Sequence, residues 1–130
     1  MKSRALLPAI LSFASCVAVN CALADDFSCP PELAIKRGQV PHPWFDDIPV
    51  PSAWCIDKSG KKNGPWWGWE PETKTILFRV NTLNGEPHGV FTMYYTNGKL
   101  AAKGSLSHGT RIGEWVTYNP DGTIKATERR

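Results

Sequence analysis

Gly85-Glu-Pro-His-Gly89-Val-Phe91-Thr-Met-Tyr94-Tyr-Thr-Asn97-Gly98-Lys-Leu100 is the stretch that decides the fold, because the chain repeats it. From Gly89 onward it matches the later stretch Gly113-Glu-Trp115-Val-Thr-Tyr118-Asn-Pro-Asp121-Gly122-Thr-Ile124. Aromatic residues fall on aromatic residues twice, Asn-Gly falls on Asp-Gly, and Leu falls on Ile. The chain therefore contains an internal repeat.

A Gly-x-x-x-Gly frame opens each copy, and the first glycines of the three frames are 25 and 24 residues apart. The earliest copy is degenerate. It keeps its two aromatic positions, but Pro71-Glu-Thr73 stands where the later turn glycine would be. The glycines that we assign to turns are Gly60, Gly64, Gly85, Gly89, Gly98, Gly109, Gly113 and Gly122.

Short segments rich in β-branched and aromatic residues, at 76–80, 90–95 and 115–118, predict strands. The pairs Asn97-Gly98 and Asp121-Gly122 predict two-residue hairpin turns at positive φ, with return strands at 100–106 and 123–127. Each repeat is then one hairpin, which cannot bury its apolar face alone. We expect an all-β fold in which tandem hairpins form an elongated antiparallel sheet.

The repeat also predicts the core, because its aromatic positions recur in every copy. We expect the recurring aromatic residues to pack between hairpins: Trp66, Trp69, Phe91, Tyr94, Trp115 and Tyr118.

The pattern G-x-W/F-x-x-Y-x-x-[ND]-G-x-[LI], present in two copies, resembles the MORN repeat in the variant form of bacterial secreted proteins. The resemblance covers residues 60–125, about half of the chain. It implies β-hairpin repeats, and bacterial proteins of this type are often labelled antitoxins. MORN-type repeats are also linked to membrane association.

The first 24 residues have the features of a secretory signal peptide: Lys2 and Arg4, an apolar run, and a small-x-small site ending at Ala24. We expect cleavage there and a mature protein in the bacterial periplasm or secreted. A competing interpretation is lipoprotein processing at Cys16, which would leave three other cysteines. Cleavage after Ala24 leaves only Cys29 and Cys55, and this even count favours the ordinary signal and predicts a disulfide.

Charge argues against nucleic acid as a partner. The chain has 15 basic and 12 acidic residues. Removal of Lys2 and Arg4 would leave 13 against 12, a net charge of +1, which gives no strong field for a phosphate backbone. The same near-neutral charge weighs against direct membrane binding unless the chain is lipidated at Cys16.

Residues 25–59 differ in composition from residues 60–130. Six prolines between positions 30 and 51 predict that no long strand or helix forms there, apart from one or two helical turns at residues 32–37. The segment is nevertheless too apolar to be a solvated linker. We expect an irregular, disulfide-closed cap over the first repeat.

A binding surface is predicted from aromatic residues that do not follow the repeat. Trp67 lies between two positions of the pattern and should face away from Trp66, so we expect it to be exposed. Trp44 and Phe45 could complete an aromatic patch with it or fill the cap.

The sequence offers little for catalysis or for a cofactor. His88 and His108 border successive glycine frames and could meet, but no metal-ligand spacing is present. The acidic pairs Asp46-Asp47 and Glu70/Glu72 lie too near in sequence to face each other across a cleft. We therefore expect no enzyme, no metal and no cofactor.

The expected function is binding of a protein or peptide partner, with toxin neutralisation or an envelope scaffold as specific forms. An envelope-anchored structural lipoprotein and a small hydrolase are the alternatives. Mass spectrometry of the mature N-terminus separates the lipoprotein, and a concave pocket with convergent acids or histidines would indicate the hydrolase.

Overall fold

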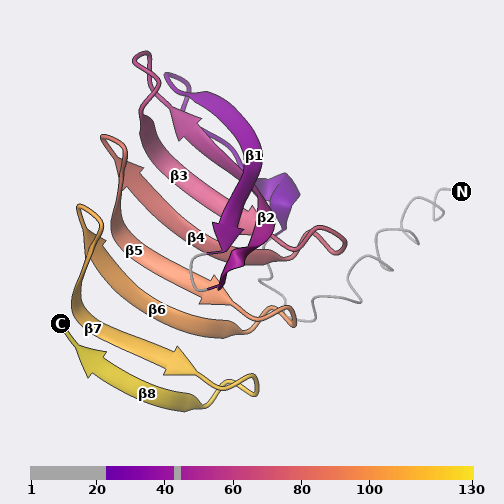
Figure 1. The fold of residues 1–130 in the computed structure, drawn as a ribbon, viewed down its shortest axis with the longest axis vertical. Helices are drawn as coiled ribbons and strands as arrows, with labels where there is room; N and C mark the ends of the chain where they lie inside the picture. Colours follow the sequence, from indigo (N-terminus) through magenta and orange to yellow (C-terminus); the bar gives the residue numbers. More distant parts are fainter. Residues whose placement is uncertain (1–22, 43–44) are drawn as a thin grey trace, which may run out of the picture.

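The computed structural model describes residues 23–42 and 45–130, without the side chains of residues 45–47. In the described residues, eight strands form one antiparallel sheet in sequence order (Figure 1). The strands are β1 (Ala34–His42), β2 (Phe45–Ile56), β3 (Lys62–Trp69), β4 (Ile76–Leu83), β5 (Glu86–Tyr94), β6 (Leu100–Ser107), β7 (Thr110–Tyr118) and β8 (Ile124–Arg129).

The order of the strands makes the fold a stack of hairpins. Each strand pairs with the next one along the chain, from β1 at one edge to β8 at the other. Figure 1 shows the sheet as open and curved, with its strands stacked along the long axis of the molecule. The all-β prediction of tandem hairpins in an antiparallel sheet is confirmed. No helix in the described part of the chain is long and apolar enough to cross a membrane.

The Pro-rich segment is regular, which corrects the expectation of an irregular cap and of helical turns at residues 32–37. β1 begins at Ala34 and pairs with β2 along its whole length, so the cap region and the repeats share one sheet. Strand β1 lies at an edge, where a missing backbone donor is tolerated. Pro49 and Pro51 lie in the part of β2 that pairs with β1 only, since the pairing of β2 with β3 begins at Ser52.

The β1–β2 hairpin still covers the first repeats, as the cap was expected to do. Val40 and Val50 pack against the cluster that contains Phe78, Val80 and Phe91. The part of the hairpin that is not paired with β3 therefore lies over one face of the sheet. In Figure 1, β1 crosses in front of the central strands. Burial of the two valine side chains favours the position of the hairpin over this face.

The turns are of two kinds, and their positions differ from the prediction. Two-residue turns lie at the second and third glycine frames, where Asn84-Gly85 and His108-Gly109 have positive φ at both residues. Gly98 and Gly122 have positive φ as predicted, but they close longer loops. In the first of these, Gly98 N donates to Tyr95 O at 2.9 Å and Tyr95 N donates to Lys99 O at 2.9 Å. This is a type I turn followed by a left-handed glycine.

The second glycine of each frame forms a bulge. Gly64, Gly89 and Gly113 have φ of +90°, +97° and +70° inside strands β3, β5 and β7. At the same point in each repeat the register shifts: Ile56 pairs with Lys62, whereas Trp54 pairs with Trp66. Two residues on one strand therefore oppose four on the next, and such bulges bend a strand.

The sheet buries side chains on both faces. We call the face that carries Trp66, Phe91 and Trp115 the groove face, and the face that carries Trp67, Ala53 and Cys55 the disulfide face. The β1–β2 hairpin covers part of the groove face. The N-terminal segment covers part of the disulfide face, with Ala24 and Phe27 buried against it.

The predicted disulfide is present and fixes the N-terminal segment. Cys29 and Cys55 are bonded, with their Cα atoms 5.8 Å apart and a sequence separation of 26 residues. Cys55 is fully buried in β2. Residues 1–22 of the predicted signal peptide, Cys16 among them, lie outside the described residues. Its last two residues are described: Leu23 forms a β-bridge with Thr75, and Ala24 N donates to Lys74 O.

Candidate functional site

The recurring aromatic residues divide between the two faces. The first aromatic of each copy (Trp66, Phe91, Trp115) lies on the groove face. The second aromatic (Trp69, Tyr94, Tyr118) follows three residues later, and an odd spacing along a strand reverses the face. The core prediction is accurate for Trp69, Phe91 and Trp115, which are buried, whereas Trp66, Tyr94 and Tyr118 are half-buried.

A second row runs beside the aromatic row on the groove face. Lys62, Pro87 and Arg111 are the third residues of the three glycine frames, each four residues before an aromatic of the first row. The frames are stacked directly on each other, because Gly85 N donates to Lys62 O and Gly109 N donates to Pro87 O, both at 2.8 Å. The repeat thus builds two parallel rows from equivalent positions.

The bulges bring the two rows into contact. Four residues of a regular strand span about 13 Å. Across the bulge at Gly64, however, the Lys62 ammonium lies 3.7 Å from the centroid of the Trp66 ring. Across the bulge at Gly113, the Arg111 guanidinium lies 4.3 Å from the Trp115 ring. Both are cation–π contacts.

The aromatic row, together with Pro87 and Arg111, forms the floor of a groove of about 370 Å³. Lys62 does not line this groove, but its ammonium lies over Trp66, which does. Pro41, on the overlying β1, contributes to its wall. The full lining is Pro41, Trp66, Phe78, Val80, Pro87, Phe91, Leu106, Gly109, Arg111 and Trp115. Among the residues that the structure describes, this lining includes no carboxylate, histidine or cysteine, so the groove offers contact area and one guanidinium but no acid–base pair.

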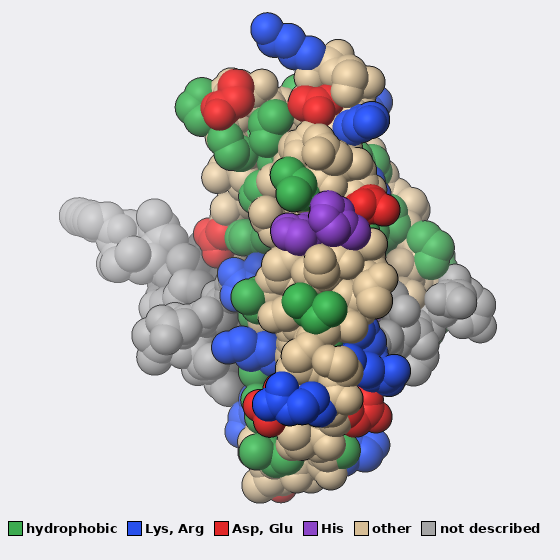
Figure 2. Space-filling view, turned by 90° about the vertical axis from the view of Figure 1, so that its left-hand side faces the viewer, with side chains coloured by type: hydrophobic (Ala, Val, Ile, Leu, Met, Phe, Trp, Pro, Cys, Tyr) green, Lys and Arg blue, Asp and Glu red, His purple; other side chains and the backbone are tan. Residues whose placement is uncertain are grey.

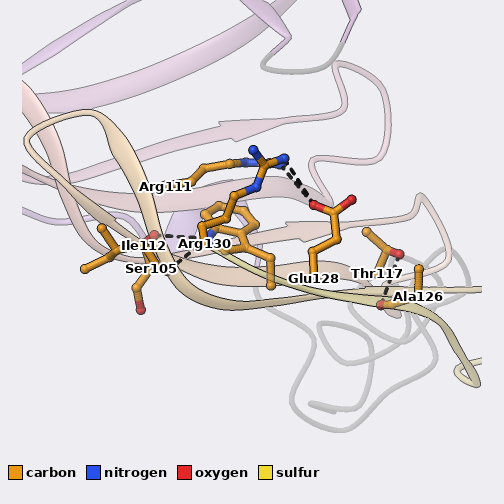
Figure 3. Close-up of polar contacts among 8 residues, drawn as sticks. Ser105, Arg111, Ile112, Thr117, Ala126, Glu128 and Arg130 are labelled. Atoms are coloured by element: carbon orange, nitrogen blue, oxygen red, sulfur yellow. Dashed lines mark hydrogen bonds and ion pairs between the residues drawn. The ribbon is translucent and has the colours of Figure 1, made fainter.

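Arg111 is held at the β7–β8 end of the groove (Figure 3). Its guanidinium lies 3.9 Å from Glu128 Oε1, while Arg130 lies closer to the same oxygen, at 3.1 Å. The indole of Trp115 beneath it donates to the carbonyl oxygens of Ser105 and Ile112, at 3.1 and 3.2 Å. The ring is therefore fixed, and the guanidinium is only weakly neutralised.

Lys62 lies at the opposite end of the rows. Its ammonium lies over both Trp66 and Trp54, the latter at 4.9 Å. Desolvation by these neighbours lowers the pKa of Lys62 from its ordinary value. Trp66 is itself fixed, because its indole N–H donates to Ser52 Oγ at 2.7 Å. An anion brought to this ammonium would restore charge stabilisation that burial has removed.

Trp67 faces away from Trp66, as predicted, but it is not freely exposed. It is half-buried on the disulfide face, where its ring meets that of Phe27 edge-on at 5.3 Å. The Arg79 guanidinium lies 5.2 Å from the Trp67 ring and donates to Tyr94 Oη at 2.8 Å. Trp44 lies outside the described residues, and so does the side chain of Phe45. These three residues are therefore not brought together as one described patch.

The two frame histidines do meet, as the repeat suggested. The rings of His88 and His108 are 4.8 Å apart, and His108 Nδ1 lies 3.2 Å from Glu86 Oε1. Figure 2, which looks onto the edge formed by these turns, shows histidine side chains in contact with each other there. His88 Nδ1 accepts from the backbone N–H of His108, which links successive frames. Within residues 23–42 and 45–130, no group of three or more His, Cys, Asp or Glu is arranged to hold a metal ion.

In the acidic pair Glu70/Glu72, the side chain of Glu70 stabilises the turn between β3 and β4. Glu70 Oε1 accepts from the backbone N–H groups of Glu72 and Thr73, both at 2.8 Å. These bonds lower the pKa of the Glu70 carboxyl, chiefly through the Thr73 N–H. The side chains of Asp46 and Asp47 are not among those that the structure describes.

Lys62, Pro87 and Arg111 were not predicted as site residues. The signal was present, since all three occupy the same position of the Gly-x-x-x-Gly frame. They were missed because the bulge that places each above its aromatic partner is not apparent from strand periodicity.

Comparisons with known proteins add no function. No family model matches the chain, and no curated protein matches it. Its structure is similar to the crystal structure of accessory secretory protein 1, 2 and 3 in Streptococcus pneumoniae, with a TM-score of 0.44 and 13% sequence identity. That match covers 86% of this chain and 20% of the other. A likeness of this strength carries no argument about what the protein does.

Proposed function

We propose that the protein is an exported, non-catalytic binding module that holds a peptide segment of another protein in the groove. The observation that supports this most strongly is the pair of rows, because three repeats place equivalent residues side by side over one surface. Aromatic rings fixed by hydrogen bonds lose little entropy on binding, and rings of this kind are frequent at binding hot spots.

The shape of the groove favours a chain over a small compact ligand. The groove follows the aromatic row across β3, β5 and β7, and it is walled on one side by Pro41. Its lining is almost wholly apolar, with Arg111 as the one charged residue among those lining it. A peptide can bury apolar side chains in such a groove while its own polar backbone remains toward solvent.

Export is supported by the disulfide and by the sequence of the first 24 residues. Structural disulfides persist in oxidising compartments, and Cys29–Cys55 fixes the segment that follows the proposed cleavage site. Toxin neutralisation, which the MORN resemblance implies, and an envelope scaffold would both use a surface of this type. Acylation at Cys16 would instead make the protein an anchored lipoprotein, and mass spectrometry of the mature N-terminus distinguishes these forms.

A selection from a random peptide library displayed on phage tests the proposed function. Leu106→Glu places a charge in the half-buried lining of the groove, and Val90→Glu places one on an exposed valine that does not line it. Selected peptides should lose binding to Leu106→Glu and keep it for Val90→Glu, with both variants shown to be folded by circular dichroism. Peptides that bind both variants equally well would contradict the proposal, as would a selection that enriches no peptide.

A further inference from the structure

The two rows carry positive charge at their ends and none in the middle: Arg111 lines the groove, and Lys62 lies over the lining residue Trp66 at the other end. Lys62 and Arg111 lie in the first and third frames, and Pro87 occupies the equivalent position of the second. Each cation is fixed over a tryptophan, at 3.7 Å for Lys62 and 4.3 Å for Arg111. The pattern is thus cation, apolar centre, cation, built at one position of the repeat.

Neither cation is fully neutralised by the protein. Lys62 has no ion pair among the residues that the structure describes, and its contacts there are the rings of Trp54 and Trp66. Arg111 has one distant carboxylate neighbour, Glu128, which lies closer to Arg130. An anion brought to a partly desolvated cation of this kind stabilises its charge.

The centre of the groove lacks the polar groups that a sugar or a nucleotide would need. Pro87, Phe91 and Leu106 lie between the two ends. Because this stretch can give contact area but few hydrogen bonds, it suits apolar side chains.

We infer that the groove recognises an extended acidic peptide, with one carboxylate at the Lys62 end, another at the Arg111 end, and apolar residues between them. This inference rests on the proposed function and specifies its ligand. It is carried by the positive charge at the two ends and by the apolar centre between them, where Pro87 occupies the frame position that Lys62 and Arg111 occupy at the ends.

The geometry of the sheet sets the spacing of the two acids. β3 and β7 are four strands apart, and neighbouring strands lie about 4.8 Å apart, so the cations are separated by about 19 Å along the sheet. An extended peptide advances about 3.3 Å per residue. Two carboxylates that reach both cations are therefore about five to six residues apart in the ligand.

The phage selection also tests this inference, through the composition of the enriched peptides and their affinities for charge variants. Enriched sequences should carry Asp or Glu at two positions about five to six residues apart, with apolar residues between. Lys62→Gln and Arg111→Gln should each weaken the binding of synthetic versions of these peptides about three- to fivefold, as for a partly exposed ion pair. Arg111→Lys should restore most of the loss, and Lys103→Gln, at an exposed position, should change nothing.

The possible failures are distinguishable. Enriched peptides that compete for the groove but show no preference for acids would overturn the inference and leave the proposed function standing. Acidic peptides whose affinity is unaffected by Lys62→Gln and Arg111→Gln would also overturn it. A selection that enriches no groove-dependent peptide would overturn both.

Discussion

The rings of Phe91 and Trp115 lie 5.8 Å apart, although β6 separates the two strands that carry them. The residue between them on β6 is Gly104, which pairs with Phe91. A Cβ added at Gly104 would lie only 2.0 Å from the nearest atom of the Trp115 indole. Because Gly104 has no side chain, the rings of Phe91 and Trp115 can approach each other across β6. At the equivalent position of the previous repeat, Val80 separates Trp66 from Phe91.

Gly104→Ala should destabilise the protein by about 1–3 kcal/mol, the usual cost of overpacking a core. The fixed indole has little freedom to move aside, because its N–H donates to two backbone carbonyls. Urea unfolding followed by tryptophan fluorescence measures the change, with the exposed Lys103→Ala on the same strand as a control. Equal stability of the two variants would show that the ring can retreat.

Lys74→Gly should stabilise the protein by about 0.5–1 kcal/mol. Lys74 has a φ of +66° in the β3–β4 turn, where the degenerate repeat lacks its glycine. A residue with a Cβ is strained there, whereas glycine is not. Lys99→Gly, next to a turn that already has its glycine, is the control and should not raise the unfolding midpoint. A lower midpoint for Lys74→Gly would contradict the strain argument.

Truncation of two tryptophans should separate a core position from a half-buried one. Trp115 is only 4% exposed, so Trp115→Ala should cost about 3–5 kcal/mol. Trp67→Ala should cost less, on the order of 2 kcal/mol, because Trp67 is half-buried against Phe27. The sequence alone predicted an exposed Trp67, and truncation of an exposed side chain would cost little. A negligible effect of Trp67→Ala would mean that the N-terminal segment contributes little to stability.

Loss of the Cys29–Cys55 bridge should cost about 3.5 kcal/mol in a loop-entropy model. Both cysteines are joined in the disulfide and carry no thiol, so the native protein should resist alkylation until a reductant is added. A Cys29→Ala/Cys55→Ala double variant, compared with the oxidised protein in urea, measures the difference. Equal midpoints would show that packing of Phe27 alone holds the segment.

Acid should destabilise the protein through its turn carboxylates. Hydrogen bonds hold the pKa of Asp57 and Asp121 below 3.8 and that of Glu70 below 4.5, in each case led by a bond within the same turn. Because these pKa values are lower in the folded state, the stabilisation is complete above the unfolded values and is lost as pH falls through the folded ones. We expect stability to fall below about pH 4.5. Glu70→Gln should reduce the steepness of that fall. An unchanged dependence of stability on pH would contradict this role of the Glu70 carboxylate.

The sequence predicted the repeat, the strands and the disulfide because each leaves a local signal: glycine spacing, aromatic alternation and an even cysteine count. It failed at the prolines of β1 and β2, where the edge position and the one-sided pairing that tolerate them are tertiary facts. It also failed at the groove, since the contact between Lys62 and Trp66 depends on a bulge. Trp67 was expected to be exposed because nothing in the sequence indicates that Phe27 packs on it.

Two-dimensional NMR of the tryptophan indole N–H groups gives the most direct test that the groove is the binding surface. A groove-selected acidic peptide should be titrated into the ¹⁵N-labelled protein. The indole signals of Trp66 and Trp115 should shift together and saturate at one peptide per protein, while the signal of Trp67, on the disulfide face, stays in place. Shifts at Trp67 without shifts at Trp66 and Trp115 would contradict the account.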